Sequence, residues 1–178
     1  MEAPGGASDQ GEGEIRRAAG PGVAAALMRL YVIRHATAEG PGEAGDVHRR
    51  LTPLGRWQAK EAGRALLNRG VGLGRLFSSP AARARETAEL IAGELNPSPA
   101  VEILEALYSG PTLEGILCEL QSSSEVALVG HLPAVEHFVR ALISHPAELR
   151  FPPSTVCCVE FTGAPAQGEG RLVWRITP

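Results

Sequence analysis

The chain has 178 residues, which suits one domain whose core is large enough to need no disulfide or metal staple. Its formal net charge of −3 leaves no general basic surface, so we expect no nucleic-acid partner. The three cysteines, two of them adjacent at Cys157 and Cys158, form neither a disulfide framework nor a zinc-binding pattern, and they predict a reduced, cytoplasmic protein.

Residues 1–27 are rich in Gly, Ala and Glu and contain almost no large apolar side chains. Such a segment buries too little surface to offset the entropy lost on ordering, so we predict a disordered tail before a domain spanning residues 28–178. Arg16 and Arg17, followed by Ala-rich sequence, imitate an export signal, but Arg29 interrupts the apolar run. No apolar run approaches the ~20 residues that a membrane-spanning helix needs, so we expect no contact with a membrane.

The domain opens with an apolar run that predicts a strand at 29–34, buried on both faces. Residues 37–50, rich in Gly and charge, predict a surface loop. A helix over 53–68 follows, because Thr52 is a good N-cap and Pro53 suits the first helical position. Its apolar positions recur at helical spacing and are expected to face the core: Leu54, Trp57, Ala62, Ala65 and Leu66.

Strands and helices alternate along the rest of the chain. The further predicted elements are a strand at 75–78, a helix at 81–95, a strand at 101–104, a helix from Pro111 or Thr112 to 120, a strand at 125–129, a helix at 133–144, and strands at 155–161 and 172–176. This alternation predicts a three-layer α/β/α sandwich with a mostly parallel sheet. The last two strands are joined by a Gly-rich turn and are expected to pair at an edge of the sheet.

Three of the predicted strand-to-helix junctions carry residues suited to binding phosphate. Arg34 and His35 end the first strand, and Arg83 lies in the first turn of the helix at 81–95. His131 follows the strand at 125–129. In a parallel sheet these junctions lie at the same edge, where helix N-termini add N–H groups and a positive dipole. Arginines neutralise phosphate oxygens and a histidine attacks phosphorus, so the pattern predicts phosphoryl transfer without a metal or other cofactor.

These residues stand in four motifs that resemble, in order, those of the histidine phosphatase (phosphoglycerate-mutase-like) superfamily. The motifs are Arg34-His35-Ala36, Leu51-Thr52-x-x-Gly55-x-x-Gln58-Ala59, Ser79-Pro80-x-x-Arg83-Ala84-x-x-Thr87-Ala88 and Gly130-His131. Two further segments are similar to the SixA-type phosphohistidine phosphatases: Asp46-x-x-Arg49-x-Leu51-Thr52 and Gly130-His131-Leu132-Pro133-x-Val135. The resemblance covers residues 28–176 and implies a phosphoglycerate mutase-like fold.

The resemblance also implies roles for the residues that carry it. His35 would be the nucleophile that becomes phosphohistidine, and Arg34, Arg83 and His131 would complete the phosphate pocket. Because His35 must attack as the neutral imidazole, we expect its other ring nitrogen to donate to a backbone carbonyl. Arg49 would add a positive contact at the rim of the pocket.

The proton donor is left open by the sequence. Glu105 lies where many members of the superfamily carry an acid, and Glu39 is a weaker candidate. Members of the SixA type are understood to work without the usual acid. An imidazole that leaves a phosphoramidate P–N bond needs little acid assistance, whereas an alkoxide leaving group needs a proton.

The resemblance therefore implies a phosphatase that removes phosphate from phosphohistidine on a phosphotransfer protein, in signal transduction. Two alternatives stay open: hydrolysis of a small phosphomonoester, and a binding module that grips phosphate without catalysis. A mutase is disfavoured, because it needs a closed pocket that excludes water while its substrate reorients. We expect a monomer or a weak dimer.

The remaining histidines and the tryptophans fit structural roles. We expect His48, His137 and His145 to lie at the surface. We expect Trp57 and Trp174 to lie in the core rather than to form a platform for a substrate.

Overall fold

The computed structural model describes residues 27–43, 45–109, 113–120, 123–144 and 149–178. The predicted tail, apart from its last residue, and the position of His145 lie outside these residues. The strands are β1 (Leu27–Arg34), β2 (Arg75–Ser78), β3 (Val101–Ile103), β4 (Glu125–Gly130), β5 (Val156–Thr162) and β6 (Arg171–Ile176). The helices are α1 (Pro53–Asn68), α2 (Ala82–Glu94), α3 (Leu113–Leu120) and α4 (Ala134–Leu142), with short 3-10 helices η1 (Asp46–His48) and η2 (Glu105–Leu107). Within the described residues, no helix is long and apolar enough to cross a membrane.

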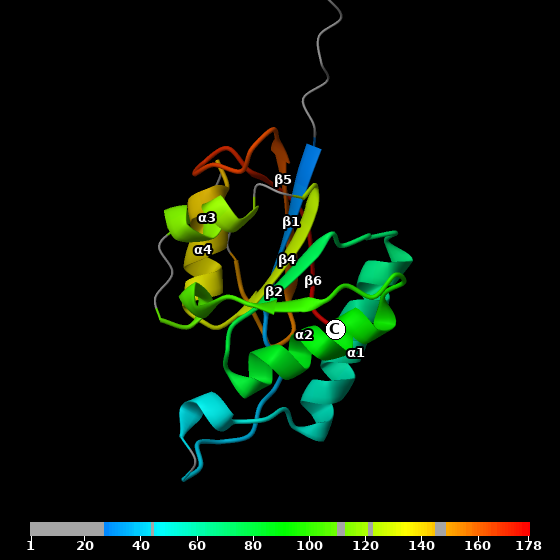
Figure 1. The fold of residues 1–178 in the computed structure, drawn as a ribbon, viewed down its shortest axis with the longest axis vertical. Coiled ribbons are helices and arrows are strands. Elements are labelled where there is room, and N and C mark those ends of the chain that lie inside the picture. The colour runs from blue at the N-terminus through cyan, green and yellow to red at the C-terminus, as the bar shows by residue number, and fades with distance from the viewer. Residues whose placement is uncertain (1–26, 44, 110–112, 121–122, 145–148) are drawn as a thin grey trace, which may run out of the picture.

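The six strands form one sheet in the order β3-β2-β4-β1-β5-β6 (Figure 1). The strands β3, β2, β4 and β1 run parallel to one another, whereas β5 is antiparallel to both β1 and β6. The prediction of a mostly parallel sheet with the last two strands paired at an edge is therefore confirmed. In the described part of the chain, no strand pairs with the outer edge of β6.

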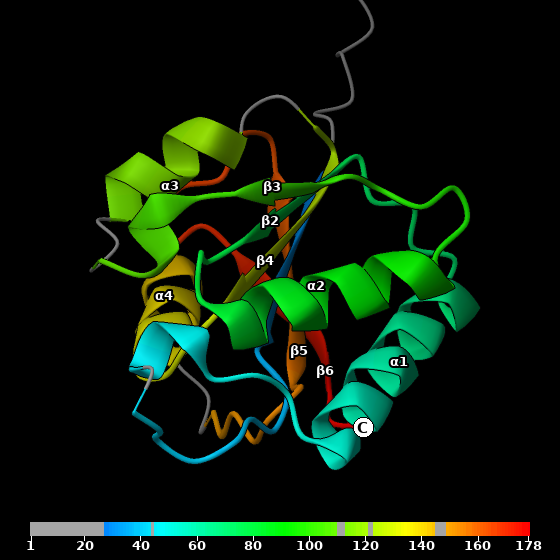
Figure 2. The same cartoon turned by 60° about the horizontal axis from the view of Figure 1, so that its bottom comes forward.

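Helices cover both faces of this sheet, α3 and α4 on one side and α1 and α2 on the other (Figures 1 and 2). Successive residues of β1 face opposite sides. Leu30 and Val32 belong to the core beneath α3 and α4, and Tyr31 and Ile33 belong to the core beneath α1 and α2. A strand buried on both faces needs apolar side chains at every position, which explains the continuous apolar run and confirms the three-layer sandwich.

Helix α1 begins where predicted and buries the expected Ala62 and Leu66, but two other predicted side chains are exposed. The Thr52 hydroxyl caps it by accepting the Gly55 N–H at 3.0 Å. The prediction that Leu54 and Trp57 face the core is wrong, because these side chains are 55% and 53% exposed. The buried residues of the helix are mostly small: Gly55, Ala59, Ala62, Gly63 and Leu66.

The small residues on α1 allow two close approaches. A Cβ on Gly63 would lie 2.9 Å from the Ile91 carbonyl oxygen and 2.9 Å from Glu94 Cβ, so α1 and α2 touch almost backbone to backbone. A Cβ on Gly55 would collide with the Thr37 carbonyl oxygen in the segment that follows β1. Large side chains do not fit at these two positions, and Leu54 and Trp57 lie on the solvent side of the helix.

The other structural predictions mostly hold. His48 and His137 are exposed, as expected. Trp174 is half-buried and packs on the core, with its ring 5.7 Å from that of Tyr31. The thiols at positions 157 and 158 are free and buried, which raises their pKa to about 12, whereas the free thiol at position 118 is exposed.

Candidate active site

The carboxyl ends of β1, β2 and β4 meet at one edge of the sheet. The register of β1 and β4 pairs Arg34 with Gly130, and the His35 amide donates to the Gly130 carbonyl at 3.0 Å. The Ser79 amide donates to the Val129 carbonyl at 3.0 Å, which brings the end of β2 level with the end of β4. The segments that carry the predicted site residues therefore start from the same edge, as a parallel sheet requires.

The ring of His35 is held in one orientation by its own chain. Its Nδ1 lies 2.8 Å from the Ala36 carbonyl oxygen. A carbonyl oxygen accepts and never donates, so this contact assigns the proton to Nδ1 and leaves a lone pair on Nε2. Arg83 Nε donates to that Nε2 at 3.3 Å. The predicted contact with a backbone carbonyl is thus present, and the free nitrogen faces a guanidinium.

The surroundings of His35 keep it neutral. Burial lowers its pKa to about 4, the charges of Arg83, Arg34 and Arg49 act in the same direction, and the bond to the Ala36 carbonyl opposes them. At neutral pH the imidazole therefore keeps the lone pair that a nucleophile needs.

His131 lies beside His35, with the two ring centroids 5.0 Å apart. Its Nε2 lies 2.8 Å from the hydroxyl oxygen of Ser79, and its Nδ1 is buried without a hydrogen-bond partner among the described residues. Burial, followed by the charges of His35 and Arg83, lowers the pKa of His131 to about 3. The ring of Tyr108 packs edge-on against it at 5.9 Å.

Arg83 lies in the first turn of α2, where the helix dipole disfavours a cation. Its side chain is nevertheless buried and faces the site. Its Nη1 donates to the Asp46 carbonyl oxygen at 2.6 Å, and its Nη2 donates to Asp46 Oδ2 at 2.8 Å. One turn later, the Thr87 hydroxyl accepts the Ala36 N–H at 3.1 Å. This hydrogen bond joins helix α2 directly to the segment that carries His35.

Arg34 reaches the other side of the nucleophile. Its Nη1 donates to the Phe151 carbonyl at 2.6 Å, and its Nε is buried without a partner among the described residues. The Ser154 amide donates to the His35 carbonyl at 3.2 Å. The backbone of Ser154 has a φ of 66°, a value rare for any residue but glycine. No sequence pattern predicts this support from Ser154.

Arg49 approaches the site from the segment between β1 and α1. This segment contains η1, a short helix inside the predicted loop 37–50, and it lies beyond the carboxyl ends of the central strands (Figure 2). Arg49 Nη1 donates to Asp46 Oδ1 at 2.9 Å, and its Nε donates to the Glu39 carbonyl at 2.6 Å. Hydrogen bonds from Arg49 and Arg83 hold the pKa of Asp46 below its usual range, so this carboxylate is ionised at neutral pH.

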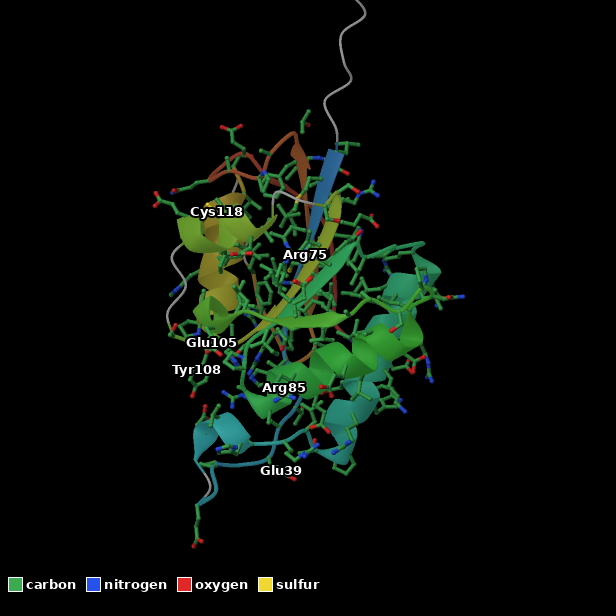
Figure 3. The ribbon with its side chains drawn as sticks, in the orientation of Figure 1. Glu39, Arg75, Arg85, Glu105, Tyr108 and Cys118 are labelled. Atoms are coloured by element: carbon green, nitrogen blue, oxygen red, sulfur yellow. The ribbon has the colours of Figure 1, made fainter. Side chains whose placement is uncertain are left out.

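The two acid candidates are not equally placed. Glu105 begins η2, and its backbone carbonyl accepts the Tyr108 N–H at 2.9 Å, which puts it beside the residue that borders His131 (Figure 3). Its carboxylate is exposed and makes no hydrogen bond or ion pair with any described residue. Glu39 is also exposed and lies well apart from Glu105 in Figure 3.

Two of the contacting residues have no role predicted from the sequence. Ser79 belonged to a motif without a stated role, but its hydroxyl contacts His131. Asp46 belonged to a motif without a stated role, although its i, i+3 spacing to Arg49 is a usable signal on a short helical turn.

The assembled site is cationic and surrounds a neutral nucleophile. Three guanidinium groups, from Arg34, Arg49 and Arg83, gather around two uncharged imidazoles. Such a set is suited to binding an anion such as phosphate beside the lone pair of His35. Across the described ranges, no three His, Cys, Asp or Glu side chains gather closely enough to hold a metal ion.

A family profile and several known proteins match the sequence. The sequence profile of the histidine phosphatase superfamily (branch 1) matches residues 30–108. An uncharacterized protein from Picosynechococcus sp. is 31% identical over 122 residues, covering 65% of this chain and 73% of that protein. The mitochondrial serine/threonine-protein phosphatase Pgam5 of Drosophila virilis is 27% identical over 158 residues, but the match spans only 54% of its length.

Solved structures share the fold over most of the chain. The protein histidine phosphatase SixA, in complex with tungstate, has a TM-score of 0.76 at 26% identity, covering 85% of this chain and 97% of the other. A protein of Nakamurella multipartitia, assigned as a phosphohistidine phosphatase SixA, has a TM-score of 0.73 at 26% identity, covering 85% and 96%. From the profile, the relatives and the shared fold, this chain belongs to the histidine phosphatase superfamily and is a phosphatase.

Proposed function

We propose that this phosphatase forms a phosphohistidine intermediate on His35 and removes phosphate from phosphohistidine on a phosphotransfer protein. The observation that carries the proposal is the ring of His35, whose Nδ1 contacts the Ala36 carbonyl at 2.8 Å and whose Nε2 faces Arg83 Nε at 3.3 Å. A neutral imidazole with its free lone pair beside a phosphate-binding guanidinium is suited to attack phosphorus.

The reaction then has two steps. The lone pair of His35 Nε2 attacks phosphorus, the P–N bond of the substrate breaks, and the leaving imidazole keeps the electron pair and takes a proton from solvent. Water then attacks the phosphohistidine, the new P–N bond breaks, and inorganic phosphate leaves with His35 neutral again. Arg34, Arg49 and Arg83 bind the nonbridging oxygens, and His131 stabilises the transferring group.

The carboxylates near the site favour a P–N over a P–O substrate. Asp46, ionised between two arginines, is a poor proton donor at neutral pH. Glu105 is exposed and contacts none of the histidines through a hydrogen bond or ion pair. An alkoxide leaving group needs a positioned acid, whereas a leaving imidazole depends on one far less. The names of the structural relatives, a protein histidine phosphatase and a phosphohistidine phosphatase, support the same substrate class. We further propose that this activity serves signalling in the cytoplasm.

The test is a paired hydrolysis assay in buffer without added metal. One substrate is a phosphohistidine-bearing phosphotransfer protein, and the other is an alkyl phosphomonoester. Wild type is compared with His35→Ala, Glu105→Gln and, as a matched control, His137→Ala, which removes an exposed histidine of α4. We expect wild type to prefer the phosphoramidate, His35→Ala to lose at least about 10³-fold in kcat, and the other two variants to stay near wild type.

Two results would contradict the proposal. Strong turnover of the phosphomonoester that collapses in Glu105→Gln would assign the chain to acid-assisted hydrolysis of small phosphomonoesters, with Glu105 as the acid. Failure of wild type to turn over either substrate while it still binds inorganic phosphate would indicate a phosphate-binding module without catalysis.

A further inference from the structure

Asp46 is a half-exposed carboxylate that bonds two arginines of the site, and the mechanism above does not use it. Its Oδ2 accepts from Arg83 Nη2 at 2.8 Å, and its Oδ1 accepts from Arg49 Nη1 at 2.9 Å. Its backbone carbonyl accepts from Arg83 Nη1 at 2.6 Å. One residue therefore holds two of the three arginines that surround the nucleophile.

The contacts leave one edge of Arg83 available. A guanidinium offers two edges to an anion, the end formed by Nη1 and Nη2 and the side that includes Nε. In Arg83, the end formed by Nη1 and Nη2 donates both of its hydrogen bonds to Asp46. The side of the guanidinium that includes Nε is directed at the site, because Nε donates to His35 Nε2. In the proposed mechanism this His35 atom bonds to phosphorus. A phosphoryl group on His35 can therefore meet the free edge without displacing Asp46.

The second arginine, Arg49, is held through different atoms. Arg49 is fixed through Nη1 by Asp46 and through Nε by the Glu39 carbonyl at 2.6 Å. Its Nη2 has no hydrogen-bond partner within the described ranges. Two guanidinium groups repel each other, and a carboxylate shared between them offsets that repulsion and fixes their spacing.

We propose that Asp46 is a positioning residue that holds Arg83 with its free edge toward the phosphoryl group on His35 and fixes Arg49 beside it. The inference rests on the proposed function and deepens it, because it explains how the arginines are arranged before substrate binds. Preorganised donors spare the substrate the cost of ordering them, so loss of Asp46 weakens binding of the phosphoryl group and slows its transfer. In this role Asp46 acts through the arginines and does not touch the reacting atoms.

The first test measures binding and needs no turnover. Inorganic phosphate is titrated into wild type, Asp46→Asn and Glu43→Gln by calorimetry. Asparagine keeps the size of the side chain and the backbone contact but cannot accept from two guanidinium groups as a carboxylate does. Glu43→Gln is the matched control, because it removes the same charge from an exposed position of the same segment. We expect Asp46→Asn to bind phosphate about 10-fold more weakly and Glu43→Gln to match wild type.

The second test asks whether Asp46 acts through Arg49. In a double-mutant cycle on kcat/KM, Asp46→Asn should cost about 10- to 100-fold in wild type and clearly less in an Arg49→Ala background. The unfolding midpoint of each variant is measured in parallel, without phosphate, to separate positioning from stability.

Three results would overturn the inference. Tighter phosphate binding by Asp46→Asn would mean that the carboxylate competes with phosphate for the arginines. Phosphate binding equal to that of Glu43→Gln would mean that Asp46 positions neither arginine, and additive effects in the cycle would mean that it does not position Arg49. If instead wild type hydrolyses neither substrate but loses phosphate affinity in Asp46→Asn, the proposed function fails while the positioning role stands.

Discussion

At the scale of single residues, the site depends on two histidines that stay uncharged. The pKa values of His35 and His131 are lowered to about 4 and about 3, mainly by burial, from an ordinary value of 6.5. Between the ordinary and the lowered values, the unfolded chain binds protons that the folded chain does not. The contribution of these neutral histidines to the free energy of unfolding is therefore complete above pH 6.5 and is lost as the pH falls toward 4.

We accordingly expect the free energy of unfolding to fall by up to about 2 kcal/mol for each of these histidines between pH 7 and pH 5. Urea unfolding at the two pH values measures this loss. His35→Gln should remove its share of the pH dependence, whereas the exposed His137→Gln should not. An unchanged pH dependence in His35→Gln would show that this ring is protonated as readily in the folded chain as in the unfolded one.

A site residue can be predicted from the sequence most readily when it lies close to the end of a strand. His35 and His131 directly follow β1 and β4, so the parallel sheet alone brings them together. Asp46 reaches the site only because of the path of its loop and the geometry of its side chain. The hydrophobic periodicity of the sequence predicts neither. The error at Trp57 has a different cause, since helical spacing identifies a face but not the space that its neighbour leaves for it.

At the scale of elements, the spacing of α1 and α2 depends on glycine. Gly63→Ala should destabilise the protein by about 1–3 kcal/mol, because its Cβ would lie 2.9 Å from the Ile91 carbonyl oxygen. Gly93→Ala is the matched control in α2, where a Cβ meets nothing within 4 Å, and it should be neutral or stabilising by about 1 kcal/mol. Urea midpoints of the two variants provide the comparison. Equal stability would mean that the two helices separate easily.

The boundaries of α1 and β2 follow the predictions closely, because capping and turn residues mark them in the sequence. The 3-10 turn η1 was missed and assigned to a loop. A segment of three residues completes too little of a period to produce a pattern, so such turns are fixed by contacts, here the bonds between Asp46 and Arg83.

At the scale of the whole molecule, the proposed phosphoryl transfer draws its positive charge from side chains. Arg34, Arg49 and Arg83 would neutralise the phosphate oxygens, as metal ions do in many phosphoryl-transfer enzymes. We therefore expect kcat/KM to be unchanged after dialysis against EDTA and to gain nothing from added Mg²⁺ or Zn²⁺. Loss of activity on chelation, with recovery on adding one divalent cation, would contradict this expectation.

The fold class could be predicted because alternating strands and helices have few ways to bury their apolar faces. The strand order β3-β2-β4-β1-β5-β6 could not be predicted from the sequence. It depends on which distant segments pair, and apolar strands such as β1 and β4 offer similar surfaces to several partners.

The outer edge of β6, with which no described strand pairs, bears on how the protein behaves when it is concentrated. A second copy could add a strand here, and two copies meeting antiparallel about Val173 would place Arg171 of one opposite Arg175 of the other. Like charges directly opposite one another destabilise such a pairing. We therefore expect these two arginines to disfavour strand-to-strand aggregation in this register.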